Sequence, residues 1–332
     1  MNIAIFGWYH HQNAGDDRIQ ACITRWLDGH TLAFLPSGRV PPVSLLRTYD
    51  AAIIGGGGLI MNRGGMFRDM ARWTRRAGIP VAIAGASVER IDDDLRREVR
   101  SFLDVCCFAW FRDRGSLEAV GDHPRAFVAP DFTWLYPQPL QPEFPAEGVA
   151  LCLQRRKNLP VEDWKHALSG LGQSIHPFPF YFENGGDAKL LRELLPDLDV
   201  PDEFDPKPLE RSACVATRRF HGLLFGLQSG RPVLTISSTP KARRFLAEHG
   251  LEHWAIGETE AGVFRDKLAE LLRERQSIRQ RALEIRQQLH SEVRKKAADA
   301  KRLLLEAAEA LPPPGRRPGA RLADLLNFRF RS

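Results

Sequence analysis

The sequence predicts an α/β protein made of two Rossmann-like domains facing a cleft, with one or two long helices closing the second domain. Short apolar segments alternate with amphipathic helical segments, which is the pattern of parallel sheets covered by helices. This alternation is broken once, between residues 136 and 145, by four prolines within nine residues. Helices and central strands do not tolerate that density of proline, so we place the domain boundary there.

Four apolar segments predict the strands of the first domain. The first strand lies near the start of the chain, and a helix follows from about Asp16. The four segments cover residues 2–7, 51–54, 79–85 and 107–111. Together they predict a domain over residues 1–140.

A second series of apolar segments follows the prolines, at residues 148–153, 174–180, 214–217 and 232–236. From residue 261 to about residue 310, apolar positions recur at helical spacing amid dense charge. We therefore expect a second domain over residues 148–310 and a basic Pro/Arg-rich tail over residues 311–332. Ligands of open α/β sheets bind at the strand ends, so a site is expected in the cleft between the domains.

Composition bounds the class of protein. With 332 residues, 43% of them hydrophobic and 27% charged, the chain is an ordinary globular protein long enough for two domains. Its five cysteines form no CxxC pair and have no histidine at ligand spacing, which favours a reduced cytoplasmic protein without structural zinc. The apolar start is too short for a signal peptide, and no segment approaches the ~18 apolar residues of a spanning helix, so we expect a cytoplasmic location.

The formal net charge of +6 permits nucleic acid, anionic lipid or an acidic substrate as partner. No helix-turn-helix, zinc-finger or aromatic ribonucleoprotein motif occurs, so nucleic acid is not expected. The tail is basic and could contact the anionic inner face of the cell membrane or an acidic neighbour. The alternative is a solvated, frayed tail.

The most informative segment covers residues 217–226, where two guanidinium groups and an imidazole stand at the start of an apolar helix. Arg218, Arg219 and His221 predict an anion site that contains a proton carrier. Lys241 follows the next strand and adds an ammonium group, as a second phosphate or carboxylate contact requires. These residues predict chemistry on an acidic small molecule.

Two loops of the first domain could complete such a site. Gly56 and Gly57 belong to a glycine run that follows a strand and could bring backbone N–H groups to an anion; a tight strand-to-helix turn is the alternative. The run is not G-x-G-x-x-G, and no Walker A lysine motif occurs. After the first strand, Asp16 or Asp17 could cap the next helix, which leaves Asn13 unexplained.

These segments in this order resemble the polysaccharide pyruvyl transferase family. The resemblance runs from about residue 1 to residue 250 and rests on an ordered set of short motifs. They are Asn13-Ala14-Gly15-Asp16, Gly55-Gly56-Gly57, Arg112-Asp113-Arg114-Gly115-Ser116, Pro130-Asp131-Phe132, Arg219-Phe220-His221 and Pro240-Lys241. The resemblance implies the two-Rossmann architecture of one large glycosyltransferase class, with the acceptor on the N-terminal domain and the donor on the C-terminal one.

The chain departs from the family pattern at two places. Asp17 stands where the family usually has Glu, and Gly85-Ala86-Ser87-Val88 replaces a Gly-x-Gly-Pro-like turn. That turn could shape the acceptor side. The identity of the acceptor sugar therefore does not follow from the resemblance.

The reaction that the resemblance implies moves the pyruvyl unit of phosphoenolpyruvate onto two hydroxyls of one sugar and releases phosphate, without a further cofactor or a metal. Such a route needs cations for the carboxylate and phosphate, and a group that exchanges protons near neutral pH. Arg219 and Lys241 suit the first role, and His221 suits the second. The remaining substrate-binding candidates are Arg218, Arg155, Asn13, Asp16, Gly56, Gly57 and Asp131.

Several alternatives stay open. His221 could be a histidine that only bonds the backbone, and Arg219 could be a structural bridge to Asp131 or Glu210. Arg218 could replace Arg219 as the anion clamp, because neighbours on an extended segment point to opposite sides. A nucleotide-sugar glycosyltransferase would need a carboxylate on a ribose, for which Glu183 and Asp187 are candidates. A non-catalytic relative that binds an anionic sugar is the third function considered.

Overall fold

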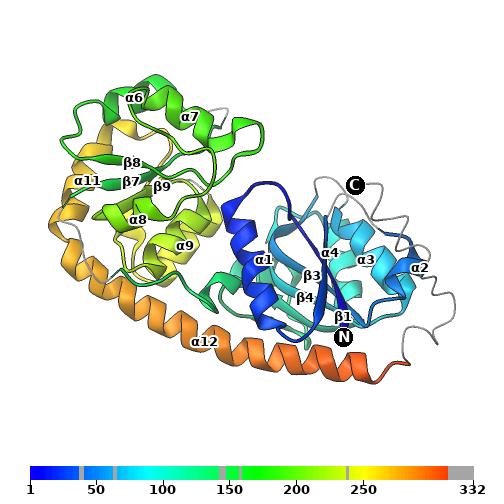
Figure 1. Cartoon of the computed structure of the whole chain (residues 1–332). Helices are drawn as coiled ribbons and strands as arrows, with labels where there is room; N and C mark the ends of the chain where they lie inside the picture. The colour runs from blue at the N-terminus through cyan, green and yellow to red at the C-terminus, as the bar shows by residue number, and fades with distance from the viewer. Residues whose placement is uncertain (37–40, 63–65, 142–146, 157–158, 237–238, 313–332) are drawn as a thin grey trace. The chain divides into compact units, whose positions relative to one another are not determined.

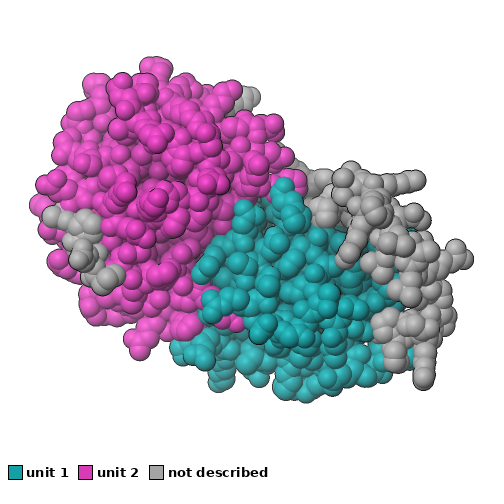
Figure 2. Space-filling model, in the orientation of Figure 1, with its two compact units in different colours: residues 1–10, 16–135, 291–332 teal, residues 11–15, 136–290 magenta. Residues whose placement is uncertain are grey.

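The computed structural model describes residues 1–36, 41–62, 66–141, 147–156, 159–236 and 239–312. These residues form two compact units, coloured separately in Figure 2. Unit 1 comprises residues 1–10, 16–135 and the chain from residue 291 onward. Unit 2 comprises residues 11–15 and 136–290.

Unit 1 is built on a six-stranded sheet in the order β2-β1-β3-β4-β5-β6, in which every neighbouring pair is parallel. Its central strands are rich in branched apolar residues and buried, as strands covered by helices must be. The strands are β1 (Asn2–Gly7), β2 (Thr31–Pro36), β3 (Ala51–Met61), β4 (Val81–Glu89), β5 (Cys106–Phe111) and β6 (Ala126–Val128).

Helices alternate with these strands (Figure 1). They are α1 (Ala14–Trp26), α2 (Val43–Leu46), α3 (Met66–Ala77), α4 (Asp93–Leu103) and α5 (Arg114–Val120), followed by a short 3₁₀ helix, η1 (Phe132–Trp134). Aspartates begin two of the helices by accepting a backbone N–H of the first turn: Asp92 from Leu95 at 2.7 Å, and Asp113 from Ser116 at 2.8 Å.

Unit 2 is built on a five-stranded sheet in the order β11-β10-β9-β7-β8, again with parallel pairs throughout. Its strands are β7 (Val149–Cys152), β8 (Ile175–Pro177), β9 (Cys214–Thr217), β10 (Val233–Ile236) and β11 (Ala255–Ile256). The helices are α6 (Val161–Leu168), α7 (Gly186–Leu194), α8 (Lys207–Arg211), α9 (Phe220–Gln228), α10 (Pro240–Glu248) and α11 (Phe264–Arg273). The 3₁₀ helices are η2 (Glu183–Gly185), η3 (Glu252–Trp254) and η4 (Ala261–Val263).

The last helix, α12 (Arg275–Glu309), contributes residues to both units. We expected the closing helices to belong to the second domain as far as residue 310. From Ser291 onward, however, α12 belongs to unit 1. The Trp26 indole donates to the Ala297 carbonyl at 2.9 Å, and the Lys296 ammonium lies 5.5 Å from the Phe127 ring centroid.

The predicted fold class is confirmed: two parallel α/β sheets with a long C-terminal helix. Each predicted strand has a counterpart, but three strands at sheet edges, β2, β6 and β11, were not predicted. Strand β3 also runs through the glycine segment to Met61, where we expected a loop or turn.

Candidate functional site

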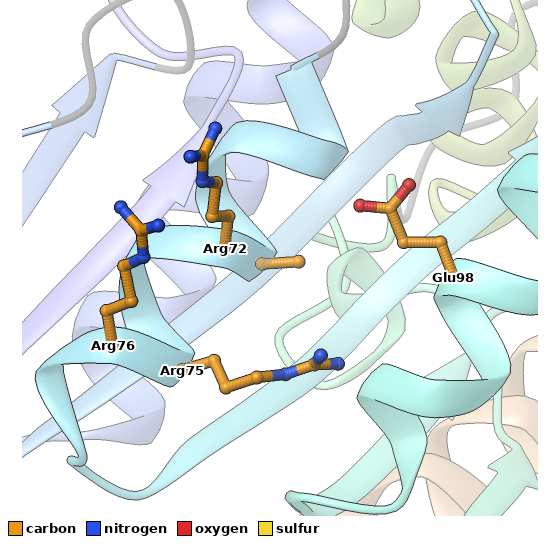
Figure 3. A pocket seen from close by; sticks show the side chains of 5 residues that line it. Arg72, Arg75, Arg76 and Glu98 are labelled. Carbon is orange, nitrogen blue, oxygen red and sulfur yellow. The ribbon is translucent and has the colours of Figure 1, made fainter.

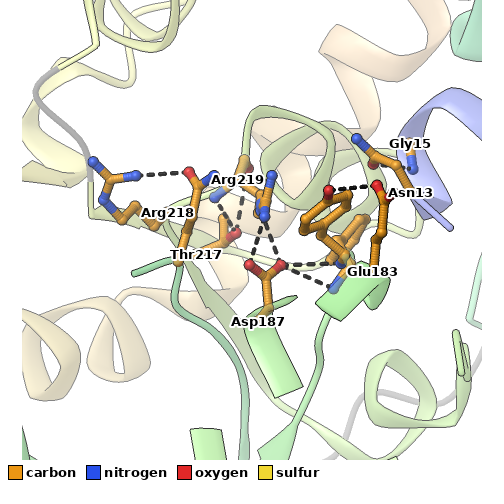
Figure 4. A network of polar contacts seen from close by, with 10 residues as sticks. Asn13, Gly15, Glu183, Asp187, Thr217, Arg218 and Arg219 are labelled. Atoms are coloured by element: carbon orange, nitrogen blue, oxygen red, sulfur yellow. Dashed lines mark hydrogen bonds and ion pairs between the residues drawn. The ribbon is translucent and has the colours of Figure 1, made fainter. Parts of the chain in front are cut away.

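A short segment near the start of the chain lies along the backbone after β8 in unit 2 (Figure 4). Asn13 forms an antiparallel bridge with Tyr181, and the Ala14 amide donates to the Phe180 carbonyl at 2.8 Å. The side-chain oxygen of Asn13 accepts the Gly15 amide at 3.2 Å. These contacts fix residues 11–15 to the rest of unit 2.

His221 lies against this segment. It is the second residue of α9 and is half-buried. A β-carbon placed on Gly15 would lie 2.0 Å from Nδ1 of His221. The glycine therefore leaves the space that the imidazole occupies.

Arg219 stands just before α9 and forms a two-pronged ion pair with Asp187. Nε lies 2.9 Å from Oδ2, and Nη2 lies 2.5 Å from Oδ1. Asp187 is 1% exposed, and its Oδ2 also accepts the amides of Phe180 and Tyr181. The guanidinium carbon of Arg219 lies 5.4 Å from the Tyr181 ring centroid. The carboxylate and the ring together fix the plane of this guanidinium.

The turn into α9 is held by Thr217, the last residue of β9. Its hydroxyl accepts the Arg219 amide at 3.0 Å. A β-carbon on Gly222 would lie 2.3 Å from that hydroxyl, so a larger residue there would displace it. The turn between β9 and α9 therefore determines where the side chains of Arg219 and His221 point.

Tyr181 and His11 both contact the carboxylate of Glu183. The Tyr181 hydroxyl donates to Oε2 at 2.7 Å, and Nδ1 of His11 lies 3.3 Å from the same oxygen. The Tyr181 hydrogen bond, more than the His11 contact, lowers the pKa of Glu183. The Glu183 side chain stays 40% exposed.

Arg218 points away from Arg219, as Figure 4 shows. Its Nε donates to Glu258 at 2.7 Å, and its Nη1 donates to Gln154 at 2.8 Å. The side chain is 4% exposed. The adjacent residues Arg218 and Arg219 thus belong to two different hydrogen-bond networks. Arg218 joins the segment at Glu258 to Gln154, which follows the end of β7.

The other two predicted cations of unit 2 differ in surroundings. Lys241, near the start of α10, places its ammonium 5.6 Å from the Phe220 ring centroid, and that centroid lies 6.1 Å from the His221 ring. Lys241 and His221 are therefore both neighbours of the Phe220 ring. Arg155 is half exposed and forms an ion pair with Glu193.

The predicted glycines lie inside β3 of unit 1. Gly56 and Gly57 have φ values of +86° and +85°, and the pairing of β3 with β4 shifts register between Gly57 and Ile60. A β-carbon on Gly56 would lie 2.6 Å from the Ile19 side chain. These glycines are needed for a left-handed backbone and for the close approach of α1.

Asp16 follows Gly15 in sequence but belongs to unit 1. It lies in the first turn of α1 and is 8% exposed. A β-carbon on Gly57 would lie 3.0 Å from its carboxylate. Burial, and after it the Asp16 charge, raise the pKa of the nearby Tyr9 hydroxyl.

Asp131 is paired inside unit 1. Arg112 donates to it at 3.0 Å, and both side chains are 3% exposed. The Asp131 carboxylate also accepts the Thr133 amide at 3.0 Å and begins η1. Arg112 in turn donates to Ser87 at 2.9 Å. These contacts link two of the motifs of the sequence resemblance, those of Arg112 and Asp131, to the turn at Ser87 where the chain departs from the family pattern.

Sequence reasoning did not predict the ion pair of Arg219 with Asp187. The sequence suggests Asp131 or Glu210 as a structural partner of Arg219, and Asp187 only as a ribose ligand. The two paired residues are 32 positions apart, and no local pattern joins them. The placement of Tyr181 beneath Arg219 was likewise not predicted.

Two features are absent from the described residues. No group of three or more His, Cys, Asp and Glu side chains there is arranged to hold a metal ion. Within the same residues, no helix combines the length and apolar composition that crossing a bilayer requires.

The fold places the chain among two-sheet proteins that include glycosyltransferases and sugar-nucleotide epimerases. A glycosyltransferase from Rickettsia africae superposes with TM-score 0.61 at 10% identity, over 93% of this chain and 99% of that one. UDP-GlcNAc 2-epimerase from Neisseria meningitidis, bound to UDP-GlcNAc, gives TM-score 0.56 at 10% identity over 85% and 94%. A calicheamicin glycosyltransferase gives 0.52 at 11% identity over 94% and 99%. At these identities the likeness defines the fold, which is glycosyltransferase-B-like.

The sequence profile of the polysaccharide pyruvyl transferases matches residues 8–240. The chain therefore belongs to the polysaccharide pyruvyl transferase family, as its motifs predicted. Comparison with curated proteins gives no significant match.

Proposed function

We propose that this chain is a ketal pyruvyl transferase. It moves the pyruvyl unit of phosphoenolpyruvate onto two hydroxyls of one sugar, in a cell-surface polysaccharide or its lipid-linked precursor, and releases phosphate. The observation that carries the proposal is an imidazole packed on Gly15 beside an arginine whose plane Asp187 fixes. Family membership supports the same reaction class.

The anionic donor explains the cations. Phosphoenolpyruvate carries a carboxylate and a phosphate, and guanidinium groups bind both with two-pronged geometry. Arg219 is already oriented by Asp187 and Tyr181, so little ordering remains to be done when the donor binds. We assign the second positive charge to Lys241, which neighbours the same Phe220 ring as His221 does. The Arg218 side chain is 4% exposed, against 16% for Arg219, and is engaged by Glu258 and Gln154, so we assign it to positioning this segment.

The reaction balances with one proton carrier. Protonation of C3 of the enol makes C2 electrophilic, and the first sugar hydroxyl forms a bond to C2 and gives up its proton. The C2–O bond to phosphate then breaks, and the second hydroxyl closes the ketal and loses its proton. Of the two hydroxyl protons, one replaces the proton delivered to C3 and one leaves with phosphate. Imidazole is suited to this exchange near neutral pH, and we assign it to His221.

The test is direct. Purified protein is mixed with phosphoenolpyruvate and a panel of methyl glycosides, and the release of inorganic phosphate is followed together with the mass of the sugar product. A product heavier by a pyruvyl ketal supports the proposal. Phosphate release that does not depend on any acceptor, or no release with any of them, contradicts it.

A nucleotide-sugar glycosyltransferase is the second candidate, because solved structures of that fold superpose on this chain. Asp187 is a poor ribose ligand, since it is 1% exposed and accepts hydrogen bonds on both oxygens. Glu183 stays exposed enough for that role. Replacing phosphoenolpyruvate with UDP-sugars in the same assay distinguishes the two candidates.

A further inference from the structure

Three arginines of α3 line a hollow on the surface of unit 1 (Figure 3). Arg72, Arg75 and Arg76 surround a cavity of about 300 Å³ together with Ala71 and Glu98. All three arginines are exposed. The hollow lies within a single unit and is separate from the Arg219 network.

The helix determines how the three guanidinium groups gather. Arg72 and Arg76 are one turn apart, so both point the same way from α3, as Figure 3 shows. Arg75 reaches toward α4, where it donates to Ser101 at 3.4 Å and lies 6.0 Å from the Phe102 ring centroid. Arg75 thus lines the side of the hollow that is next to α4.

The charge balance of this helix differs from that of its neighbour. On α4, Arg96 and Arg97 each pair with an aspartate three residues earlier, Asp93 and Asp94. The acid that lines the hollow, Glu98, is bound by Arg68 at 2.9 Å. Among the described residues, no carboxylate is within 4.0 Å of the guanidinium nitrogens of the three arginines in the hollow.

Such an arrangement is unfavourable without an anion. Like charges one turn apart destabilise a helix, and three in one hollow repel one another. The carbonyl end of α3 favours cations in its last turn, which accounts for Arg75 and Arg76 but not for Arg72. Arg47 also donates to the Arg76 carbonyl at 3.3 Å and adds a fourth positive group at this end.

We propose that this hollow binds the phosphate groups of anionic lipid headgroups and holds the chain at a membrane surface. Arginine forks match phosphate oxygens, and the three exposed groups can reach neighbouring headgroups at once. Trp73 supports a lipid surface over a soluble phosphate. The Trp73 side chain is half-buried, and its ring centroid lies 5.6 Å from the guanidinium carbon of Arg76. Tryptophan is favoured at the boundary between water and lipid, because one end of its ring system is apolar and the other is polar.

The proposal is tested by co-sedimentation of the full-length chain with vesicles of phosphatidylglycerol and phosphatidylcholine at low salt. Removing three charges with R72Q/R75Q/R76Q should lower the partition coefficient about 100-fold, since each basic residue near an anionic surface contributes about 1 kcal/mol. R72K/R75K/R76K keeps the charge but loses the two-pronged contacts, so its partition coefficient should lie between those of wild type and the glutamine variant. The single change Arg72→Gln, at a side chain with no ion pair to another described residue, should lower it about fivefold.

The matched control is R294Q/K295Q/R302Q on α12, which removes the same charge from exposed positions of unit 1. If it reduces binding as much as the α3 variant does, attraction by net charge replaces the proposal. Wild type that ignores these vesicles but binds inorganic diphosphate would overturn it in favour of a soluble phosphate. Equal thermal midpoints confirm that the variants are folded. Because turnover is not measured, the outcome does not depend on the proposed function.

Discussion

The imidazole of His221 lies directly against the backbone of Gly15. A β-carbon on Gly15 would come within 2.0 Å of Nδ1 and 2.9 Å of the Cβ of His221. Because the clash includes Cβ of the histidine, rotation of the ring alone cannot relieve it. The glycine of the Asn-x-Gly-Asp motif thus sets the position of the proposed proton carrier.

Gly15→Ala should therefore impair catalysis more than it destabilises the fold. Residue 15 lies in the first turn of α1, where alanine is the better helix former by about 1 kcal/mol. We expect kcat to fall at least tenfold, because a 1 Å displacement of a catalytic group can cost up to about 100-fold. Gly262→Ala is the control, since a β-carbon there meets nothing within 4 Å. A fully active Gly15→Ala enzyme would show that the imidazole position is not critical.

His221→Ala should abolish turnover and leave the fold intact. General acid–base groups contribute about 100- to 10,000-fold to rate. The measurement is phosphate release at neutral pH, with far-ultraviolet circular dichroism to confirm folding. His166→Ala, at an exposed histidine of α6, serves as the control. A variant that keeps more than about a third of the wild-type rate would make His221 structural.

Arg219→Lys should weaken the donor site, because an ammonium group cannot reproduce the two contacts that the guanidinium makes with Asp187. We expect KM for phosphoenolpyruvate to rise about 10- to 100-fold, the scale of one hydrogen bond to a charged group. Arg218→Lys is the matched control. Its partners are Glu258 and Gln154, so it should change stability more than donor affinity. Equal KM values for Arg219→Lys and wild type would remove Arg219 from the donor site.

Asp187→Asn separates positioning from binding. The asparagine keeps the shape but removes the charge that Asp187 presents to Arg219. It also turns an N–H group either toward the amides of Phe180 and Tyr181 or toward the guanidinium, all of which are donors. We expect a loss of about 1–3 kcal/mol in the free energy of unfolding, measured with urea. Donor affinity should fall with it. Unchanged stability would mean that this carboxylate does not organise the site.

The central part of the fold could be predicted from the sequence, because buried parallel strands are continuous apolar runs. The strands at the sheet edges could not be predicted. Strands β6 and β11 have only three and two residues, too few for a pattern of apolar residues to be recognised. The glycine run was expected to end β3, yet positive φ at Gly56 and Gly57 lets the strand continue past an irregularity in its pairing.

The site was predictable where its residues are close in sequence. Arg219, His221 and the nearby Lys241 follow successive strands, so the topology brings them together. The contacts that orient them come from distant segments. Asp187 and Gly15 carry no local signal of their role, because an acid or a glycine near a helix start has an ordinary explanation.

Stability should fall as the pH drops from 7.5 to 5.5. Burial, and after it a nearby arginine, lowers the pKa of His176 and of His249. Near pH ~6.5 and below, the unfolded chain therefore takes up more protons at these two histidines than the folded chain does, so acid favours unfolding. His249→Gln should reduce this loss, and His166→Gln, at an exposed position, should not. The measurement is the thermal midpoint of each protein across this pH range. If wild type and His249→Gln show the same pH dependence, His249 does not cause the loss of stability.

The last prediction concerns the basic tail, of which residues 313–332 lie outside the described part of the chain. Its five arginines are opposed by a single acid, Asp324. If it contacts anionic lipid, deleting residues 312–332 should reduce vesicle binding steeply at low salt and little at high salt. Activity on a short soluble acceptor should be unchanged, because that acceptor needs no membrane. Combining the deletion with R72Q/R75Q/R76Q tests whether tail and hollow contribute separately: additive losses mean two contacts, and a deletion without effect leaves the α3 hollow as the membrane contact.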